Sequence, residues 1–253
     1  INVEKAGTLK ECIKNANKDY TKLQNLKITG EIDAEDFYFM RDEMTVLQSL
    51  NLKEARCLHG KFGGHEKNID KYLNGQTDIE MDNIIPERAF DEKTSLVRIV
   101  LPDKLTFIGE RAFRACSNLT GSITIPEGVT HIGASAFMWD NSLTGDLSLP
   151  STLIYIGGGG AVDIGGAFNG CNFCCELKLP NNLEYIGAQA FCNPGFYGDL
   201  HLPEKLKTID DSAFEGCKNL TGNLIIPQGI IQINYRAFAF TGFNGILQLH
   251  DGI

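Results

Sequence analysis

The sequence predicts a solenoid: a strand-rich α/β superhelix with a parallel sheet along its coils and a helical N-terminal cap. Two periodic patterns lead to this prediction. An Ala-Phe pair recurs with Phe-to-Phe spacings of 23, 24, 31, 23, 23 and 24 residues. An apolar-x-apolar-Pro element follows the same rhythm, from Ile99-Val100-Leu101-Pro102 to Leu224-Ile225-Ile226-Pro227. A unit this short cannot bury its own apolar face, so the units must stack into a shared core.

The spacing narrows the prediction to a leucine-rich-repeat solenoid, whose period is roughly 20–29 residues built on Leu-x-Leu. Apolar-x-apolar has the period of a strand, so two side chains point inward and the one between them outward. Proline has no N–H, so pairing should stop there. We expect seven such strands, about 4.8 Å apart, to form one sheet roughly 30 Å long.

The remaining columns of the repeat predict how neighbouring coils fit together. The Ala-Phe column comprises Ala89-Phe90, Ala112-Phe113, Ala136-Phe137, Ala167-Phe168, Ala190-Phe191, Ala213-Phe214 and Ala237-Phe238. We expect each Phe to stack on the Phe one coil away, and each Ala to mark a close approach of two coils. A second column holds Gly109, Gly133, Gly157, Gly187, Asp210 and Asn234. These residue types tolerate a left-handed backbone, so this column predicts a turn with positive φ.

The chain divides into two parts. Residues 85–253 form seven regular repeats, and the last stops partway, so we expect the natural chain to continue. Residues 1–84 form the N-terminal cap: a helix near 8–18 with a capping box of Thr8 and Glu11, and a second helical piece between Asp33 and Met44. Two divergent repeat strands, at 23–28 and 47–52, and a loop excursion at 58–84 complete it.

Two of the repeat units closely resemble the BspA-like leucine-rich repeats of bacterial surface and secreted proteins. They are Ile108-Gly109-Glu110-Arg111-Ala112-Phe113-Arg114-Ala115-Cys116-Ser117-Asn118-Leu119 and Ile209-Asp210-Asp211-Ser212-Ala213-Phe214-Glu215-Gly216-Cys217-Lys218-Asn219-Leu220. The resemblance covers about 85–253, and residues 28–52 resemble the segment that often precedes such repeats. It implies an extracellular or cell-surface bacterial protein, adhesin-like in its binding of host matrix proteins. It implies no shared catalytic residue.

Composition excludes several classes of partner. The formal net charge is −9 and no basic stripe is present, whereas nucleic acids and anionic lipids require Lys and Arg to neutralise phosphate. No apolar run approaches the roughly 18 residues of a membrane span. The chain starts at Ile1 without a signal peptide, as a processed secreted protein or a trimmed chain would. Nothing in the sequence indicates an oligomeric state.

The eight cysteines leave three interpretations open. Cys116, Cys171 and Cys217 share one column, three residues after the Phe, where a small buried residue fits. Cys171 and Cys174 have the spacing of zinc ligands, but no second pair completes four. A disulfide from either of them to Cys192 is the third interpretation, if the protein is secreted. The sequence therefore predicts no metal site.

No catalytic constellation or cofactor motif emerges. The five histidines form no two-His helical motif, and the glycines from Gly157 to Gly160 match neither a dinucleotide-binding nor a phosphate-binding loop. They belong instead to the insertion that stretches one repeat spacing to 31 residues. Scattered carboxylates single out no pair suited to glycoside hydrolysis. We therefore expect no enzyme and no cofactor.

Three surfaces are candidates for binding a partner. One is the ladder of outward residues on the apolar-x-apolar strands, which includes Lys178 and His201; the alternative is an ordinary solvated face. Another is the residue before each core Ile, where ring-bearing side chains follow one another; stacking between coils also explains them. The third is the insertion at 157–164 with the single tryptophan one coil before it. The candidate binding residues are Trp139, Tyr155, Gly158, Gly159, Asp163, Lys178, Tyr185 and His201.

These observations favour an extracellular binding protein that recognises a host or matrix protein, or a glycan, through its surface ladders. A structural spacer that projects another domain from the cell surface is the alternative. A hydrolase is a third hypothesis, for which only the acidic surface argues.

Overall fold

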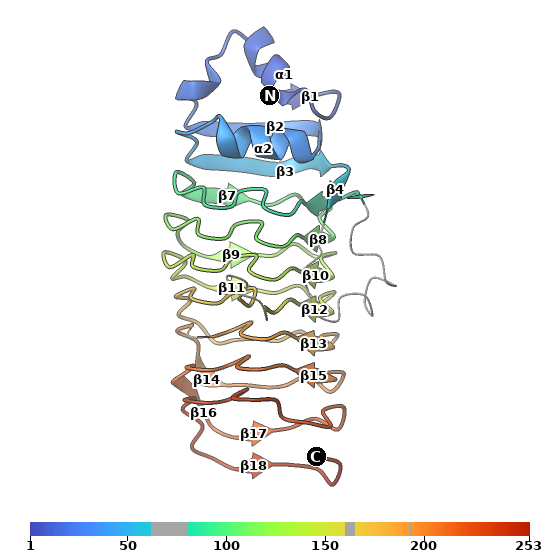
Figure 1. The fold of residues 1–253 in the computed structure, drawn as a ribbon, viewed down its shortest axis with the longest axis vertical. Helices are drawn as coiled ribbons and strands as arrows, with labels where there is room; N and C mark the ends of the chain where they lie inside the picture. Colours follow the sequence, from blue (N-terminus) through green and yellow to red (C-terminus); the bar gives the residue numbers. More distant parts are fainter. Residues whose placement is uncertain (62–79, 160–164, 193) are drawn as a thin grey trace.

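The computed structural model describes residues 1–61, 80–159, 165–192 and 194–253. Its coils stack along one long axis, with the N-terminus at one end and the C-terminus at the other (Figure 1). The strands pair in parallel between coils, except for the antiparallel pair β4 (Gly60–Lys61) and β5 (Glu80–Met81). The prediction of a leucine-rich-repeat solenoid with a helical N-terminal cap is confirmed.

The longest sheet lies on what we call the second strand face. In spatial order its strands are β6 (Ile84–Ile85), β8 (Phe107–Ile108), β10 (His131–Ile132), β12 (Tyr155–Ile156), β13 (Tyr185–Ile186) and β15 (Thr208–Ile209). Equivalent positions of successive coils are in register, so that His131 pairs with Phe107 on one side and Tyr155 on the other. The labels of β8, β10, β12, β13 and β15 form a column on one side of Figure 1.

The apolar-x-apolar elements lie on another side of the coil, which we call the first strand face. Its strands are β7 (Arg98–Val100), β9 (Ile123–Thr124), β11 (Leu147–Ser148), β17 (Leu224–Ile225) and β18 (Leu247–Gln248). Among the described strands, β9 pairs only with β11, and β17 only with β18. The prediction of one seven-stranded sheet on this face is therefore wrong.

The interruption lies between β11 and β17. Over part of that interval, neighbouring coils pair through residues upstream of the element. There β14 (Tyr197–Asp199) pairs with β16 (Asn219–Thr221), and Tyr197 forms a single bridge with Glu176.

The phenylalanine column forms the predicted stack through the core. Neighbouring rings from Phe90 to Phe238 are stacked with centroids 5.0–5.6 Å apart. The Ala of each pair is buried, from Ala89 to Ala237. One apolar cluster runs from Val3 to Ala237, so the cap and the regular coils share a core.

The column that contains Gly109, Gly133 and Gly187 requires glycine for a different reason from the positive φ that its residue types suggest. None of the six residues in that column has a positive φ, so the predicted left-handed turn is wrong there. Instead the glycines lie against the backbone of a neighbouring coil, where a Cβ on Gly133 would come within 2.6 Å of the Glu110 nitrogen. The left-handed residues come two positions later: Arg111, Ser135, Gln189, Ser212 and Arg236, with φ between 54° and 58°.

The N-terminal cap contains both helices that the sequence predicts. It consists of β1 (Asn2–Val3), α1 (Leu9–Asn15), a 3-10 turn η1 (Tyr20–Lys22), β2 (Asn25–Ile32), α2 (Ala34–Asp42) and β3 (Ser49–Cys57). The capping box at Thr8 is wrong, because the Thr8 hydroxyl donates to the carbonyl of Lys5 and caps no helical N–H. The buried carboxylate of Asp36 accepts instead from the Gly7 and Leu9 amides, each at 2.8 Å.

Candidate binding surface

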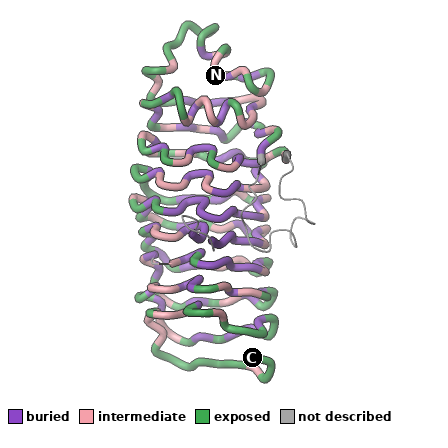
Figure 2. The backbone as a smooth tube through the Cα atoms, in the orientation of Figure 1, coloured by how far each residue is buried: buried purple, intermediate pink, exposed green. Residues whose placement is uncertain are grey.

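Strand alternation exposes two rows of side chains along the first strand face. One row contains Arg98, Ser122, Asp146, Glu176, Asp199 and Asn223, and the other contains Val100, Thr124, Ser148, Lys178, His201 and Ile225; these residues lie at the surface. The apolar residues between them, such as Leu147 and Leu177, are buried. In Figure 2 buried segments dominate the middle coils, whereas the last coil is mostly exposed.

A groove runs between these rows across four coils. One hollow, of about 630 Å³, is lined by Glu176, Leu177, Lys178, Leu179, Gly198, Asp199 and His201. A hollow of about 430 Å³ adjoins it through Glu176 and Lys178 and extends to Asp146 and Tyr197. A third, of about 230 Å³, adjoins it through Asp199 and His201 and extends to Pro227. We call this surface, between Asp146 and Pro227, the strand-face groove.

The charged side chains of the strand-face groove are not paired with one another. Among the described residues, Asp146, Glu176, Lys178, Asp199 and His201 make no side-chain hydrogen bond or ion pair.

Elsewhere on the solenoid, several charges of neighbouring coils do pair. Lys207 contacts Glu184 at 2.6 Å, and Arg114 contacts Asp91 at 2.7 Å. The groove therefore presents apolar floor residues between unpaired carboxylates and cations, which can bind a partner by charge and hydrogen bonding.

Two of the predicted site residues, Lys178 and His201, thus line the same hollow. Tyr155 and Tyr185 do not reach the surface: they are 0% and 2% exposed and stack on each other with centroids 4.7 Å apart. His131 stacks on Tyr155 and Phe107 on His131, so the rings form one column between coils. This placement favours the interior-stacking interpretation of that ladder.

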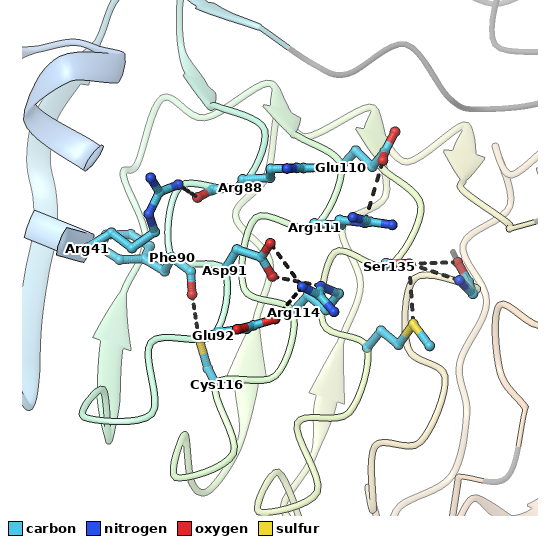
Figure 3. A network of polar contacts seen from close by, with 12 residues as sticks. Arg41, Arg88, Phe90, Asp91, Glu92, Glu110, Arg111, Arg114, Cys116 and Ser135 are labelled. Atoms are coloured by element: carbon cyan, nitrogen blue, oxygen red, sulfur yellow. Dashed lines mark hydrogen bonds and ion pairs between the residues drawn. The ribbon is translucent and has the colours of Figure 1, made fainter. Parts of the chain in front are cut away.

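The predicted residues of the insertion have separate positions. Gly158 and Gly159 are buried, and a Cβ on Gly158 would come within 1.9 Å of the Ala188 nitrogen. Asp163 lies outside the described residues. The far end of the insertion is fixed at Gly165, whose N–H donates to the buried Ser135 hydroxyl at 3.0 Å, while that hydroxyl donates to the Gly165 carbonyl at 3.1 Å (Figure 3).

Trp139 lies on a further side of the coil, after the column Phe. Its side chain is 42% exposed, and its backbone has φ of 66° at a position where Gly170 and Gly216 are also left-handed. The Arg114 guanidinium lies 5.9 Å from the indole ring, and is held there by two bonds to Asp91 and one to Glu92 (Figure 3). The tryptophan is therefore a preorganised, partly exposed aromatic group outside the groove.

The eight cysteines, all within the described ranges, are thiols. Cys116, Cys171 and Cys217 are buried in their column, and none of the eight forms a disulfide. In the same part of the chain no group of three or more His, Cys, Asp or Glu side chains could hold a metal ion. Sequence reasoning missed that Asp140 occupies the cysteine column, although its position three residues after Phe137 signals it. It also missed the groove itself, because hollows depend on how neighbouring coils pack.

No helix in the described part of the chain is long and apolar enough to cross a membrane. The fold and its repeated columns define a parallel-stranded leucine-rich-repeat protein. The family model for the BspA type leucine rich repeat region matches residues 83–195 and 146–247, with six copies. The chain therefore belongs to this family, as the resemblance in its sequence indicates.

Solved structures with a similar fold come from three bacteria. A leucine-rich-repeat protein of T. pallidum is 27% identical, with 65% of this chain and 66% of that chain covered and a TM-score of 0.45. One from Bacteroides ovatus is 20% identical, with 80% and 55% covered and a TM-score of 0.39. A leucine rich cell surface protein of Faecalibacterium prausnitzii is 16% identical, with 90% and 88% covered and a TM-score of 0.29. The chain spans about two thirds or less of the first two. No curated protein matches it.

Proposed function

We propose that this protein is an extracellular or cell-surface bacterial binding protein, and that it recognises a protein partner through the strand-face groove. The observation that carries the proposal is the contrast in charge pairing. On the other faces Lys207 and Arg114 pair with carboxylates of neighbouring coils, whereas the charges of the groove have no partner in the described chain. Charged groups that are held apart on a rigid scaffold can bind a partner without first breaking internal contacts.

The shape of the groove supports a macromolecular partner. Its adjoining hollows span four coils, with Leu177, Leu179 and Leu202 along the floor and charged groups at the rim. An apolar centre with a polar rim is the usual anatomy of a protein interface. Membership of the BspA-type family supports a surface location, in line with what the resemblance implies. The candidate ligands remain a host or matrix protein, with a glycan as the second class.

Binding of the purified protein to a panel of matrix proteins and to a glycan array tests this proposal. We expect a protein ligand whose affinity falls at least tenfold in Lys178→Glu and in a His201→Ala, Asp199→Asn double variant. Lys104→Glu, which changes an exposed charge outside the groove, is the matched control. Equal affinity of the groove variants and the control for that ligand would remove the groove from the proposal. Binding to glycans alone would overturn the protein partner.

Affinity should also fall as ionic strength rises, because exposed charges are screened within about 10 Å at 0.1 M salt. The Lys178→Glu variant should show a different salt dependence from wild type. An affinity that is the same in low and high salt would contradict recognition through the charged rim.

A further inference from the structure

A column of buried polar groups runs through the core beside the phenylalanine stack. In three coils a cysteine of this column donates its S–H to the carbonyl oxygen of the column Phe one coil earlier. The pairs are Cys116 to Phe90 at 3.1 Å, Cys171 to Phe137 at 3.0 Å and Cys217 to Phe191 at 3.1 Å. The column therefore joins consecutive coils through thiol-to-carbonyl hydrogen bonds.

Asp140 occupies this column between Cys116 and Cys171. Its side chain is 0% exposed, and neither carboxyl oxygen has a hydrogen-bond partner among the described residues. By its place in the column, the equivalent acceptor for Asp140 is the carbonyl oxygen of Phe113, the column Phe one coil earlier. The amide of Cys116 also faces the carboxyl, but it already donates to that same carbonyl at 3.1 Å.

The described residues around Asp140 include no cation to balance a charge. The coil before it contributes the Cys116 thiol and the coil after it the Cys171 thiol; burial raises the pKa of both well above their usual range. Lys93, two coils away in the same column, donates to the carbonyls of Arg41 and Met44. An isolated buried carboxylate is so costly that the group takes up a proton instead.

We infer that Asp140 is a neutral carboxylic acid in the folded protein, and that its O–H donates a hydrogen bond to the carbonyl oxygen of Phe113. The acid proton thus takes the place that a thiol hydrogen holds in the neighbouring coils. Its loss to solvent leaves a carboxylate facing a carbonyl oxygen, and two acceptors repel each other. The joint between the coils of Phe113 and Phe137 is therefore sensitive to pH, and it weakens as pH rises.

Burial raises the pKa of Asp140 well above its usual range. In the unfolded chain an aspartate loses its proton near pH 3.9. Between that value and the folded-state pKa, folding takes up one proton, so this group raises the unfolding equilibrium constant about tenfold per pH unit. Below about pH 3.9 both states hold the proton, and the contribution of Asp140 is then independent of pH.

Urea unfolding of wild type, Asp140→Asn and Asp140→Cys across pH 3 to 8 tests the inference. The amide of Asn can donate to Phe113 and cannot ionise, and Cys restores the side chain of the neighbouring coils. We expect the ratio of the wild-type unfolding constant to that of Asp140→Asn to rise about tenfold per pH unit above about pH 4. The exposed Asp103→Asn variant should show no such rise. A ratio that stays constant across this range would show that Asp140 is ionised when folded.

A second measurement uses the wild-type protein alone, so it does not depend on the variants folding. A carboxyl-carbon NMR titration can follow each aspartate, assigned through its own backbone amide. We expect the Asp140 carboxyl to keep the chemical shift of a neutral acid at pH 7, while exposed aspartates such as Asp103 show the ionised form. An ionised shift for Asp140 at pH 5 to 7 would overturn the inference.

Discussion

The ammonium group of Lys93 donates a hydrogen bond of 2.8 Å to the carbonyl oxygen of Met44, and thereby ties the first regular coil to the N-terminal cap. A second bond, of 3.0 Å, goes to the carbonyl of Arg41 near the end of α2. The last carbonyls of a helix have no partner within it, so a buried lysine at that end satisfies them. Arg41 in turn donates to the Arg88 carbonyl at 2.7 Å, also shown in Figure 3. The cap and the first regular coil therefore each donate a hydrogen bond to the other.

Lys93→Met should therefore destabilise the junction between cap and coils. The methionine keeps the volume but removes the lysine's bond to the Arg41 carbonyl and leaves the Met44 carbonyl with only the Leu47 amide, at a cost of about 1–3 kcal/mol. Hydrogen exchange should accelerate in α2 and less in the coils beyond Phe113. The exposed Lys104→Met is the control. Unchanged exchange in α2 would mean that water replaces the lysine without loss.

Phe113→Ala should lower the free energy of unfolding by about 3–5 kcal/mol, the usual range for a buried Phe. The ring is fully buried and stacks on Phe90 and Phe137 at 5.5 and 5.0 Å, so its loss leaves a cavity with an unsupported ring on each side. Urea melts measure the change. A loss below about 1 kcal/mol would show that the coils close the cavity.

Two glycine substitutions distinguish a glycine that is required by the close approach of a neighbouring coil from one that is required by a left-handed backbone. Gly133→Ala should cost ~3 kcal/mol, at the upper end of overpacking, because its Cβ would lie 2.6 Å from a backbone nitrogen that cannot move freely. Gly121→Ala should cost about 1 kcal/mol: its φ is +85° but nothing lies within 4 Å of the new Cβ. Equal losses in urea melts for the two variants would contradict the packing reason for the glycine column.

The sequence predicts the stacking direction well because every coil repeats it. The Phe column, the Leu-x-Leu alternation and the exposure of Lys178 and His201 all follow from period alone. What happens between coils is harder to predict. The strand ladder of the first strand face, which the pattern treats as continuous, is interrupted between β11 and β17.

The candidate site shows the same limit. Alternation indicates on which side of a strand Tyr155 lies, but not that the side chain is buried there between the rings of His131 and Tyr185. The pattern assigns the glycine column to the wrong cause because Gly suits both a left-handed turn and a tight approach, while Asp210 and Asn234 in the same column suit only the turn. Asp140 lies in a column of buried thiols, where a carboxylate contradicts the usual preferences of the core.

His131 makes the stability of the fold depend on pH in the opposite direction to Asp140. Burial lowers the pKa of His131 to about 4, against about 6.5 in an unfolded chain. The unfolded state therefore binds the proton more tightly, so stability is present above about pH 6.5 and is lost as pH falls towards 4. The full loss is ~3 kcal/mol at about 1.4 kcal/mol per unit.

His131→Phe should remove this acid dependence, because a phenyl ring can stack between Phe107 and Tyr155 without titrating. Urea melts between pH 4 and 7 compare it with wild type, and the exposed His201→Phe serves as the control. Parallel pH profiles for wild type and His131→Phe would show that the imidazole accepts a proton as readily in the folded state as in the unfolded chain.

Trp139→Gly should change the free energy of unfolding by less than about 1 kcal/mol. Glycine adopts the left-handed backbone of this position without strain, as Gly170 and Gly216 do in their coils, and this relief offsets the missing cation–π interaction with Arg114. Phe240 has the same left-handed position in the last coil and is more exposed, so Phe240→Gly is the matched control.

If Trp139 adds to recognition, affinity for a partner found in the panel should fall at least tenfold in Trp139→Gly and stay unchanged in Phe240→Gly. Lower stability with unchanged affinity per folded molecule would make Trp139 a packing residue. Unchanged stability together with unchanged affinity would leave recognition to the strand-face groove around Lys178 and His201.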